Sequence, residues 1–259
     1  MSLDEELSKS SRIHDVLAEH WNWAYYDTPH GECSWLLAEY VDRLKQDVES
    51  RVPVIMNELE DLLSQHTEKE YAILDVGCGV GGFVHTAIRE LGQKFEGVDF
   101  RATGIDISQD MIDYARVNLQ DSGVELVCDS ITNQDLEFRN EPFDVAIMMV
   151  TLSFYNDENS KEILRSIHSR LKEGGYLVVM DFAWTYIWSG FRLFAKPLHS
   201  LTDTFFSHLI GESFHFTNRT EDELKELMEE TGYEVAKSYL SEKTSKMKGM
   251  LVIRARKEL

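Results

Sequence analysis

Short apolar runs alternate with helix-like segments through the middle of the chain, and this pattern constrains the fold more than any other feature. Alternation of this kind is typical of a parallel sheet whose strands are joined by helices. It predicts a doubly wound α/β core, in which Gly174 and Gly175 end the last helix. The expected strands are residues 71–76, 102–107, 124–128, 143–150 and 176–180, and the expected helices are residues 82–91, 109–119 and 158–171.

The segments before and after this core follow other patterns. Residues 1–68 have the apolar spacing of helices and are expected to form a helical cap of the same domain. Residues 183–216 are rich in aromatic side chains and are expected to form a helical, aromatic insert that acts as a substrate lid. Residues 69–182 and 217–259 then make up the core itself.

The end of the chain is expected to complete the sheet. Thr220 is expected to cap a helix over residues 221–230, with Gly232 just beyond its end. Two strands follow, at residues 234–240 and 247–254, and a hairpin between them makes the last strand antiparallel. The sequence thus predicts one Rossmann-like domain with a seven-stranded, mostly parallel sheet.

Composition argues against several kinds of partner and site. The formal net charge is −20, and no dense cluster of lysine and arginine offers a surface for duplex DNA. Three cysteines without a CxxC pair predict neither a disulfide framework nor a metal site. No window reaches the roughly 18 apolar residues of a membrane span, and no export signal is visible, so we expect a cytoplasmic protein. The sequence leaves open whether the chain forms a homodimer.

The first apolar run leads directly into a glycine-rich loop at residues 77–82. A strand, a tight glycine turn and a helix start are typical of nucleotide-type sites, because glycine lets the backbone approach a ligand closely. Gly77, Gly79 and Gly82 also satisfy the dinucleotide pattern GxGxxG. Asp75 favours another ligand, since a carboxylate here suits an ammonium group better than a pyrophosphate. The alternative for Asp75 is that it only caps the loop.

Residues 71–181 resemble the class I S-adenosylmethionine-dependent methyltransferases, and the similarity extends through the final helix and the last two strands. Family motif one is matched by the segment 73–81. The resemblance implies that S-adenosylmethionine is the cofactor, that S-adenosylhomocysteine is its product, and that the methionyl part lies on the glycine-rich loop. The residues expected around that part are Asp75, Gly77, Cys78, Gly79 and Gly81.

The resemblance also implies an acid at the end of the second strand. Asp106 fits this position and would accept hydrogen bonds from both ribose hydroxyls, with Ile107 and Met111 in contact with the adenine. Asp99 is the alternative, because the interval between the glycine-rich loop and Asp106 is somewhat long.

Two further landmarks of the family follow along the chain. Asp129, with Ser130 and Ile131 after it, is expected beside the adenine amino group, although an aspartate after a strand is also a common turn former. Val150 and Thr151 end the fourth strand and are expected to line the cleft between cofactor and substrate. The chain has no Asn-Pro-Pro-Tyr or Asp-Pro-Pro-Tyr tetrad and no Pro-Cys pair, so the resemblance does not extend to DNA methyltransferases.

Methyl transfer is an in-line displacement that chiefly requires an acceptor atom held about 3 Å from the activated carbon, with water excluded. A general base is needed only if the acceptor is protonated. The candidates for this base are histidines of the insert and of the N-terminal zone, namely His199, His208, His215, His20 and His30. Tyr155 and Asp181, at the ends of strands four and five, are better placed to touch the substrate. By analogy with small-molecule members of the family, Trp21 and Tyr26 are expected to approach the cofactor, the alternative being that they are core.

The leading prediction is a methyltransferase that acts on an oxygen, nitrogen or carbon atom of a small molecule. A protein or tRNA methyltransferase is the nearest alternative, and the acidic charge counts against the RNA version. A non-catalytic regulator that binds S-adenosylmethionine and a nicotinamide-dependent oxidoreductase are further alternatives. Asp75 disfavours the oxidoreductase.

Overall fold

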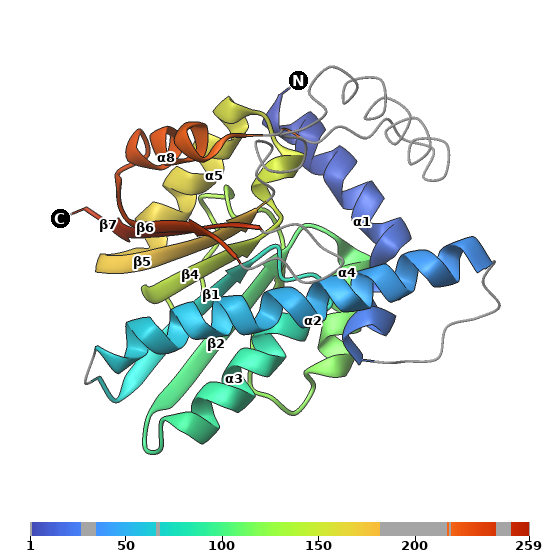
Figure 1. The fold of residues 1–259 in the computed structure, drawn as a ribbon, viewed down its shortest axis with the longest axis horizontal. Coiled ribbons are helices and arrows are strands. Elements are labelled where there is room, and N and C mark those ends of the chain that lie inside the picture. Colours follow the sequence, from blue (N-terminus) through green and yellow to red (C-terminus); the bar gives the residue numbers. More distant parts are fainter. Residues whose placement is uncertain are drawn as a thin grey trace.

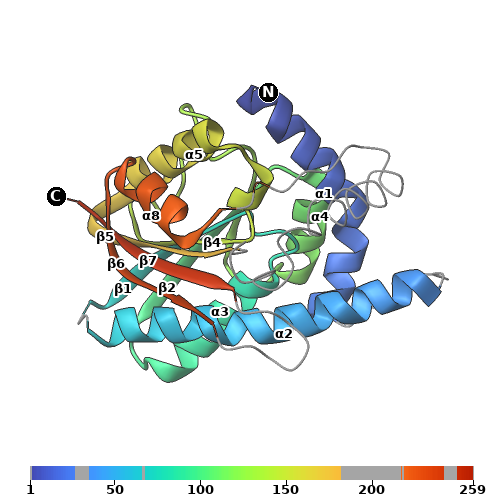
Figure 2. The same cartoon turned by 45° about the horizontal axis from the view of Figure 1, so that its top comes forward.

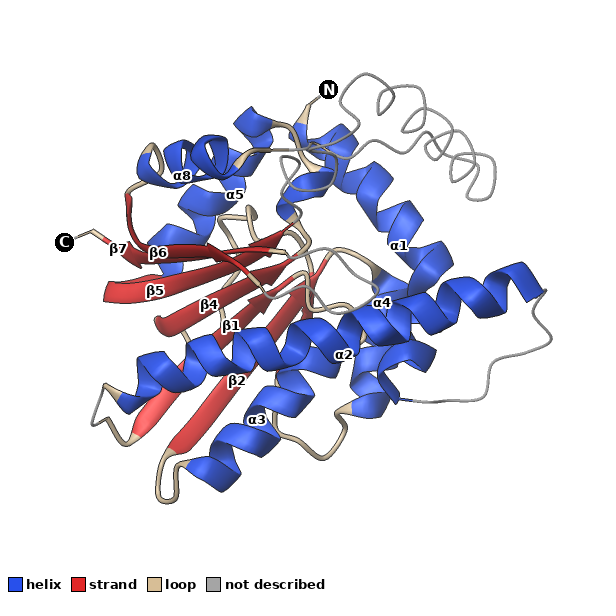
Figure 3. Cartoon of the chain, viewed as in Figure 1, coloured by secondary structure: helices blue, strands red, loops and turns tan. Residues whose placement is uncertain are grey.

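The described residues form a central sheet with helices on both faces (Figures 1 and 3). The computed structural model describes residues 2–26, 35–65, 68–181, 217, 219–241 and 250–258, with residues 16, 20, 23, 24 and 35–49 described in backbone only. The predicted insert at residues 183–216, with its candidate base His199, lies outside the described residues.

One sheet runs through the described structure. Its strands are β1 (Glu70–Val76), β2 (Asp99–Asp106), β3 (Glu125–Cys128), β4 (Phe143–Met149), β5 (Leu171–Asp181), β6 (Tyr233–Leu240) and β7 (Leu251–Lys257). They lie in the order β3-β2-β1-β4-β5-β7-β6. Neighbouring strands from β3 to β5 are parallel, whereas β7 is antiparallel to both β5 and β6. The predicted Rossmann-like sheet with an antiparallel last strand is confirmed.

Helices form a layer on each face of this sheet. They are α1 (Leu3–Tyr26), α2 (Trp35–Ser64), α3 (Gly82–Lys94), α4 (Gln109–Asn118), α5 (Asp157–Arg170) and α8 (Glu221–Glu229). Figure 2 shows α2 and α3 on one face of the sheet and α5 and α8 on the other. Buried side chains of α2, α3 and α4 join one apolar cluster, and those of α5 and α8 join another. Successive strand residues point to opposite faces, so Ile73 belongs to the first cluster and Leu74 to the second.

The carboxyl ends of β1, β2 and β4 lie side by side. Val76, the last residue of β1, pairs with Ile105 in β2 and with Met148 in β4. The chain leaves β1 towards β2 on one side and later returns to β4 on the other, which makes this edge the switch point of the sheet. Ligands of doubly wound sheets bind at such a point. The glycine-rich loop begins here, directly after Val76.

Helix starts are encoded locally by polar caps. The Thr220 hydroxyl accepts a hydrogen bond from the Glu223 amide at 3.2 Å, and the Glu223 carboxylate accepts one from the Thr220 amide at 2.7 Å. This capping box confirms the start predicted for α8. Ser108 caps α4 with a single hydrogen bond, in which its Oγ accepts from the Met111 amide at 3.1 Å.

Some predicted boundaries were wrong. β5 starts at Leu171, immediately after α5 ends at Arg170, and not at residue 176. Gly174 and Gly175 therefore lie within the strand. A Cβ on Gly175 would meet the carbonyl oxygen of Lys172 at 2.9 Å and that of Asp144 at 3.1 Å, so glycine is needed for close backbone approach. β7 runs over residues 251–257 instead of 247–254, of which residues 247–249 lie outside the described chain.

Candidate cofactor site

The glycine-rich loop packs directly against the ends of β2 and β4. The amides of Gly77 and Cys78 both donate to the Ile105 carbonyl, at 2.8 and 3.1 Å. Gly77 has φ +76°, and a Cβ there would lie 2.5 Å from Thr151 Oγ1. Only glycine fits this turn, because a side chain would be strained and would collide with Thr151. The loop and the end of β4 are thus brought into contact.

Asp75 lies beneath this loop as a buried carboxylate. Its side chain is 2% exposed, and among the described residues its Oδ2 has no hydrogen-bond partner. Burial, together with the nearby Asp106 carboxylate, raises the pKa of Asp75 to about 7. A buried acid beside a second acid is a favourable neighbour for a cation. The site therefore fits a ligand with an ammonium or sulfonium group, as S-adenosylmethionine has.

Asp106 joins the glycine-rich loop to the turn after β2. Its Oδ2 accepts from the Gly79 amide and its Oδ1 from the Ser108 amide, both at 2.9 Å. The rival acid, Asp99, is the first residue of β2 and therefore lies at the opposite edge of the sheet. Of the two predicted ribose ligands, only Asp106 lies beside the glycine-rich loop.

The turn after β3 adjoins this site from the other side of β2. The Asp129 amide donates to the Asp106 carbonyl at 3.1 Å. The Asp129 carboxylate accepts from the Ser130 amide at 2.7 Å and from Asn133 Nδ2 at 3.0 Å, so it also forms the local turn that the sequence left as an alternative. Ile131 is buried in the adjacent core. This turn is thus both near the site and locally stabilised.

Helix α1 lies over the glycine-rich loop on the side of α4. Met111, Val80 and Ala18 form a small buried cluster, against which Trp21 and Tyr26 pack while partly exposed. Burial, followed by the nearby Cys78, raises the pKa of the Tyr26 phenol. The structure therefore brings both predicted α1 aromatics close to the loop.

The end of β4 is conformationally unusual. Val150 has φ +53°, a left-handed conformation that β-branched residues rarely adopt, and its amide donates to the Met180 carbonyl at 2.7 Å. Thr151 follows, with Oγ1 hydrogen-bonded to the Met149 carbonyl at 3.2 Å. Strain of this kind is held in place by its surroundings and often marks a functional site.

Tyr155 and Asp181 hold different places at this edge. One Asp181 oxygen accepts from the Ser153 amide at 3.0 Å, so this buried acid orders the loop between β4 and α5, residues 150–156, here called the β4–α5 loop. The buried Tyr155 phenol is hydrogen-bonded to Ser10 of α1 and lies within electrostatic reach of Asp106. Tyr155 therefore links the β4–α5 loop to α1.

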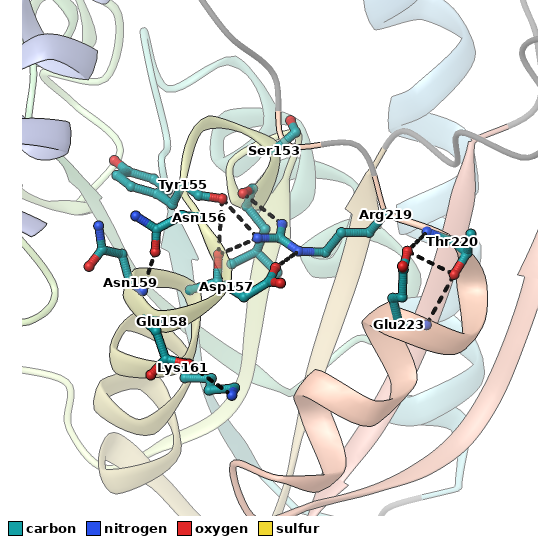
Figure 4. Close-up of polar contacts among 12 residues, drawn as sticks. Ser153, Tyr155, Asn156, Asp157, Glu158, Asn159, Lys161, Arg219, Thr220 and Glu223 are labelled. Atoms are coloured by element: carbon teal, nitrogen blue, oxygen red, sulfur yellow. Dashed lines mark hydrogen bonds and ion pairs between the residues drawn. The ribbon is translucent and has the colours of Figure 1, made fainter. Parts of the chain in front are cut away.

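Arg219 fixes the β4–α5 loop from the α8 side (Figure 4). Its guanidinium donates to the carbonyls of Leu152 and Tyr155, at 3.0 and 2.8 Å, and to Ser160 Oγ at 3.0 Å. Its Nε donates to the Asp157 carboxylate at 2.8 Å. This role could not be predicted from the sequence, because an arginine before a helix cap has no distinctive pattern.

Other features of the described residues do not adjoin this site. A cavity of about 510 Å³ lies where α5 ends and before β4 begins, at the opposite edge of the sheet. Its lining residues are Gln134, Leu136, Glu137, Phe138, Glu141, Ser169 and Arg170. The described residues hold no cluster of three or more potential metal ligands, and no described helix has the length and hydropathy to cross a membrane.

Comparison with known proteins agrees with this site. A methyltransferase domain family matches residues 73–175. Malonyl-[acyl-carrier protein] O-methyltransferase from Acetivibrio thermocellus is 32% identical over 126 residues, which cover 49% of this chain and 41% of the relative. The ubiquinone/menaquinone biosynthesis C-methyltransferase UbiE from Vibrio cholerae is 27% identical over 187 residues, covering 64% of this chain and 65% of the relative. The chain thus matches only part of the length of each relative.

A solved structure shares the fold over nearly the whole chain. Magnesium protoporphyrin IX methyltransferase from Synechocystis, with bound SAM, superposes with a TM-score of 0.62 at 12% identity, covering 98% of this chain and 97% of that one. The likeness concerns the fold, and the family match adds the glycine-rich loop and the strand-end acids. Residues 73–175 of the chain thus match a methyltransferase domain, within a fold that the chain shares with this SAM-bound methyltransferase.

Proposed function

We propose that the chain transfers the methyl group of S-adenosylmethionine to an oxygen, nitrogen or carbon atom of a small-molecule acceptor, leaving S-adenosylhomocysteine. The observation that carries this proposal is the buried Asp75, whose Oδ2 is unpaired among the described residues, beneath a loop that matches a methyltransferase domain. A dinucleotide would bring a pyrophosphate towards this carboxylate, which is unfavourable.

Each strand end has a distinct binding task in this proposal. Asp75 and the loop residues Gly77, Cys78, Gly79 and Gly81 hold the methionyl part. Asp106 holds the ribose, for which its backbone hydrogen bonds to Gly79 and Ser108 keep the carboxylate oriented. The adenine is contacted by Ile107, Met111, Asp129, Ser130 and Ile131. The cofactor supplies a methyl group already activated by its sulfonium.

The remaining task of the protein is to place the acceptor and exclude water. Val150 and Thr151 border the glycine-rich loop, and the β4–α5 loop carries Tyr155, which is hydrogen-bonded to Ser10 of α1. Because burial raises the pKa of the Tyr155 phenol, it stays protonated and acts as a hydrogen-bond donor, not as a base. Asp181 orders the loop through Ser153, and we keep it with His199 as a candidate for contact with the acceptor.

A small-molecule acceptor is supported by two observations. The net charge of −20 is unfavourable for binding RNA or DNA. The UbiE relative acts, by its name, in quinone biosynthesis. Residues 1–68 and 183–216, which flank the core residues 69–182 and 217–259, are proposed to form the acceptor side as cap and lid. A protein acceptor is the outcome that would replace this choice.

The first experiment is calorimetric titration with S-adenosylmethionine and S-adenosylhomocysteine. We expect both to bind with micromolar affinity. Asp106→Asn is expected to weaken binding roughly tenfold to hundredfold, because a charge-assisted hydrogen bond is lost. Asp99→Asn is the matched control, since it removes an acid from the opposite end of the same strand. Absence of binding to the wild-type chain would refute the proposed function.

Acceptors are then screened with methyl-labelled cofactor, starting with amphipathic amines and phenols. Mass spectrometry identifies the methylated product and the fate of the cofactor together. Label in a small molecule, with equimolar S-adenosylhomocysteine, supports the proposal. Label in added protein or tRNA instead would move the assignment to those acceptors, and a modified cofactor without methyl transfer would contradict the proposal.

A further inference from the structure

Helix α1 runs across the edge of the sheet at which the cofactor residues meet (Figure 1). Ser11 Oγ donates to the Ile107 carbonyl at 3.1 Å, and Ser108 Oγ donates to the Asp15 carboxylate at 2.6 Å. Both partners belong to the turn after β2, directly beyond Asp106. The middle of α1 is therefore tied to the proposed ribose side of the site.

The C-terminal half of α1 packs on the glycine-rich loop and its helix. The Tyr25 ring lies so close to Gly82 that a Cβ there would be 1.9 Å from the ring. The Tyr26 ring lies 5.8 Å from that of His85, measured between centroids. Asn118 Nδ2 donates to Asn22 Oδ1 at 2.7 Å, which ties α4 to the same stretch of α1.

The N-terminal half of α1 is anchored on the opposite side of the site, through Glu6. This carboxylate is 7% exposed and accepts three hydrogen bonds. The donors are the Asn156 amide at 3.1 Å, Asn156 Nδ2 at 2.8 Å and Asn159 Nδ2 at 2.7 Å. A carboxylate at the start of α5 is also favoured by the dipole of that helix.

Glu6 thereby connects α1 to the β4–α5 loop, which carries Tyr155. The Tyr155 phenol in turn is hydrogen-bonded to Ser10, one turn further along α1. The rings of His14 and Phe154 lie 4.8 Å apart, measured between centroids. Helix α1 therefore spans from the acceptor side of the site to the glycine-rich loop. On the acceptor side, its buried carboxylate contact is the one that Glu6 makes with Asn156 and Asn159.

We propose that Glu6 is a latch that holds α1 closed across the cofactor site and so sets the rate at which the cofactor leaves. The proposal rests on the proposed function for the identity of the ligand. The residues that would hold the cofactor, Asp75, Asp106 and Met111, are all buried, and α1 is bonded to loops on both sides of them. Opening this side requires the three Glu6 hydrogen bonds to break together. Glu6 is thus a positioning residue that does not touch the reacting atoms.

The test measures the dissociation rate of S-adenosylhomocysteine by stopped-flow displacement. Glu6→Gln keeps the size of the side chain but replaces one acceptor oxygen with an NH₂ group that faces the Asn156 and Asn159 donors. We expect dissociation to become about tenfold faster, which corresponds to the loss of about one hydrogen bond to a charged group. Glu19→Gln is the matched control, because it removes the same charge from an exposed position of α1. It is expected to change the rate less than twofold.

A second variant tests the latch from its other side. Asn159→Ala removes one donor without altering α1, and it is expected to speed dissociation several-fold. In the double variant with Glu6→Gln the two effects should not multiply, because both break the same contact. Full multiplication, or an unchanged rate in folded Glu6→Gln and Asn159→Ala proteins, would overturn the latch.

Hydrogen exchange of the ligand-free protein separates this inference from the proposed function. Glu6→Gln is expected to speed amide exchange across residues 3–26, whereas Glu19→Gln should not. If the wild-type chain binds no S-adenosylhomocysteine, the proposed function fails while this readout still reports on the latch. Equal exchange in Glu6→Gln and wild type would refute the latch even if the cofactor binds.

Discussion

In the proposed site, Asp75 is the residue whose protonation is expected to couple most directly to binding of the cofactor. Its pKa is raised to about 7 by burial and by Asp106, so below that pH it is neutral and above it is charged. A cationic ligand binds better to the charged form. The affinity for S-adenosylmethionine should therefore rise with pH, by up to about tenfold per unit below pH 7, and level off above it.

Calorimetry between pH 5.5 and 8.5 tests this pH dependence. At pH 6, binding should release up to one proton, which is seen by comparing buffers of different ionisation heat. The titratable groups that face Asp75 are Asp106 on β2 and Cys78 in the glycine-rich loop. Burial is the largest cause of the raised pKa of the Cys78 thiol, so this thiol stays neutral over the pH range of the experiment. Asp75→Asn is expected to bind weakly and without the slope. A slope retained in that variant would assign the proton elsewhere.

The positions of the acids at the strand ends could be predicted from the sequence, because the family motifs specify both the residue type and its place after each strand. Of the two alternatives left by the sequence, the structure shows that Asp106, and not Asp99, lies beside the glycine-rich loop. Glu6 could not be predicted. It lies in the first turn of α1 with Asp4 and Glu5, where acids are favoured at any helix N-terminus, so nothing local distinguishes the one that forms a long-range contact.

The β4–α5 loop is the element whose conformation depends most on a distant residue. The guanidinium of Arg219 donates hydrogen bonds to two loop carbonyls. It also donates to the Ser160 hydroxyl and to the Asp157 carboxylate. Lysine cannot reproduce this arrangement of donors. Arg219→Lys is therefore expected to lower the free energy of unfolding by about 2 kcal/mol or more, since buried carbonyls lose their donors. Urea unfolding measures this loss.

Arg165→Lys provides the control, because Arg165 is an exposed residue of α5. It should change stability by less than about 0.5 kcal/mol. Equal stability of the Arg219→Lys and Arg165→Lys proteins would mean that water replaces the arginine donors and that the loop does not depend on them.

Most helices and strands could be predicted because their apolar residues recur with a clear helix or strand period. The ends of these elements depend on contacts with residues far away in the sequence. β5 was expected to start at Tyr176, since Gly174 and Gly175 look like a helix stop. In the fold Leu171 already pairs with Phe143, and the glycines allow the backbone to pass Asp144 closely. Sequence alone does not contain that pairing, so the early start of the strand could not be read locally.

In the molecule as a whole, the arrangement of the helices around the sheet was only partly predictable. The fold class followed from the alternation of strands and helices, but the crossing of α1 over the strand ends did not, because it rests on contacts far apart in sequence, such as Glu6 with Asn156 and Ser11 with Ile107. Helical spacing shows that a segment is a helix, and only the tertiary structure shows which edge of the sheet it covers.

The net charge of −20 predicts that salt stabilises the folded chain. Like charges repel more strongly in the compact state than in the unfolded chain, and raising salt from 0.1 to 1 M shortens the screening length from about 10 to 3 Å. Several described ion pairs, such as Arg89 with Glu90, are exposed and contribute little, so their screening does not offset the gain. Thermal unfolding in potassium chloride should show Tm rising by several degrees over this range. A falling Tm would mean that specific ion pairs, and not the overall repulsion, dominate the electrostatics of this fold.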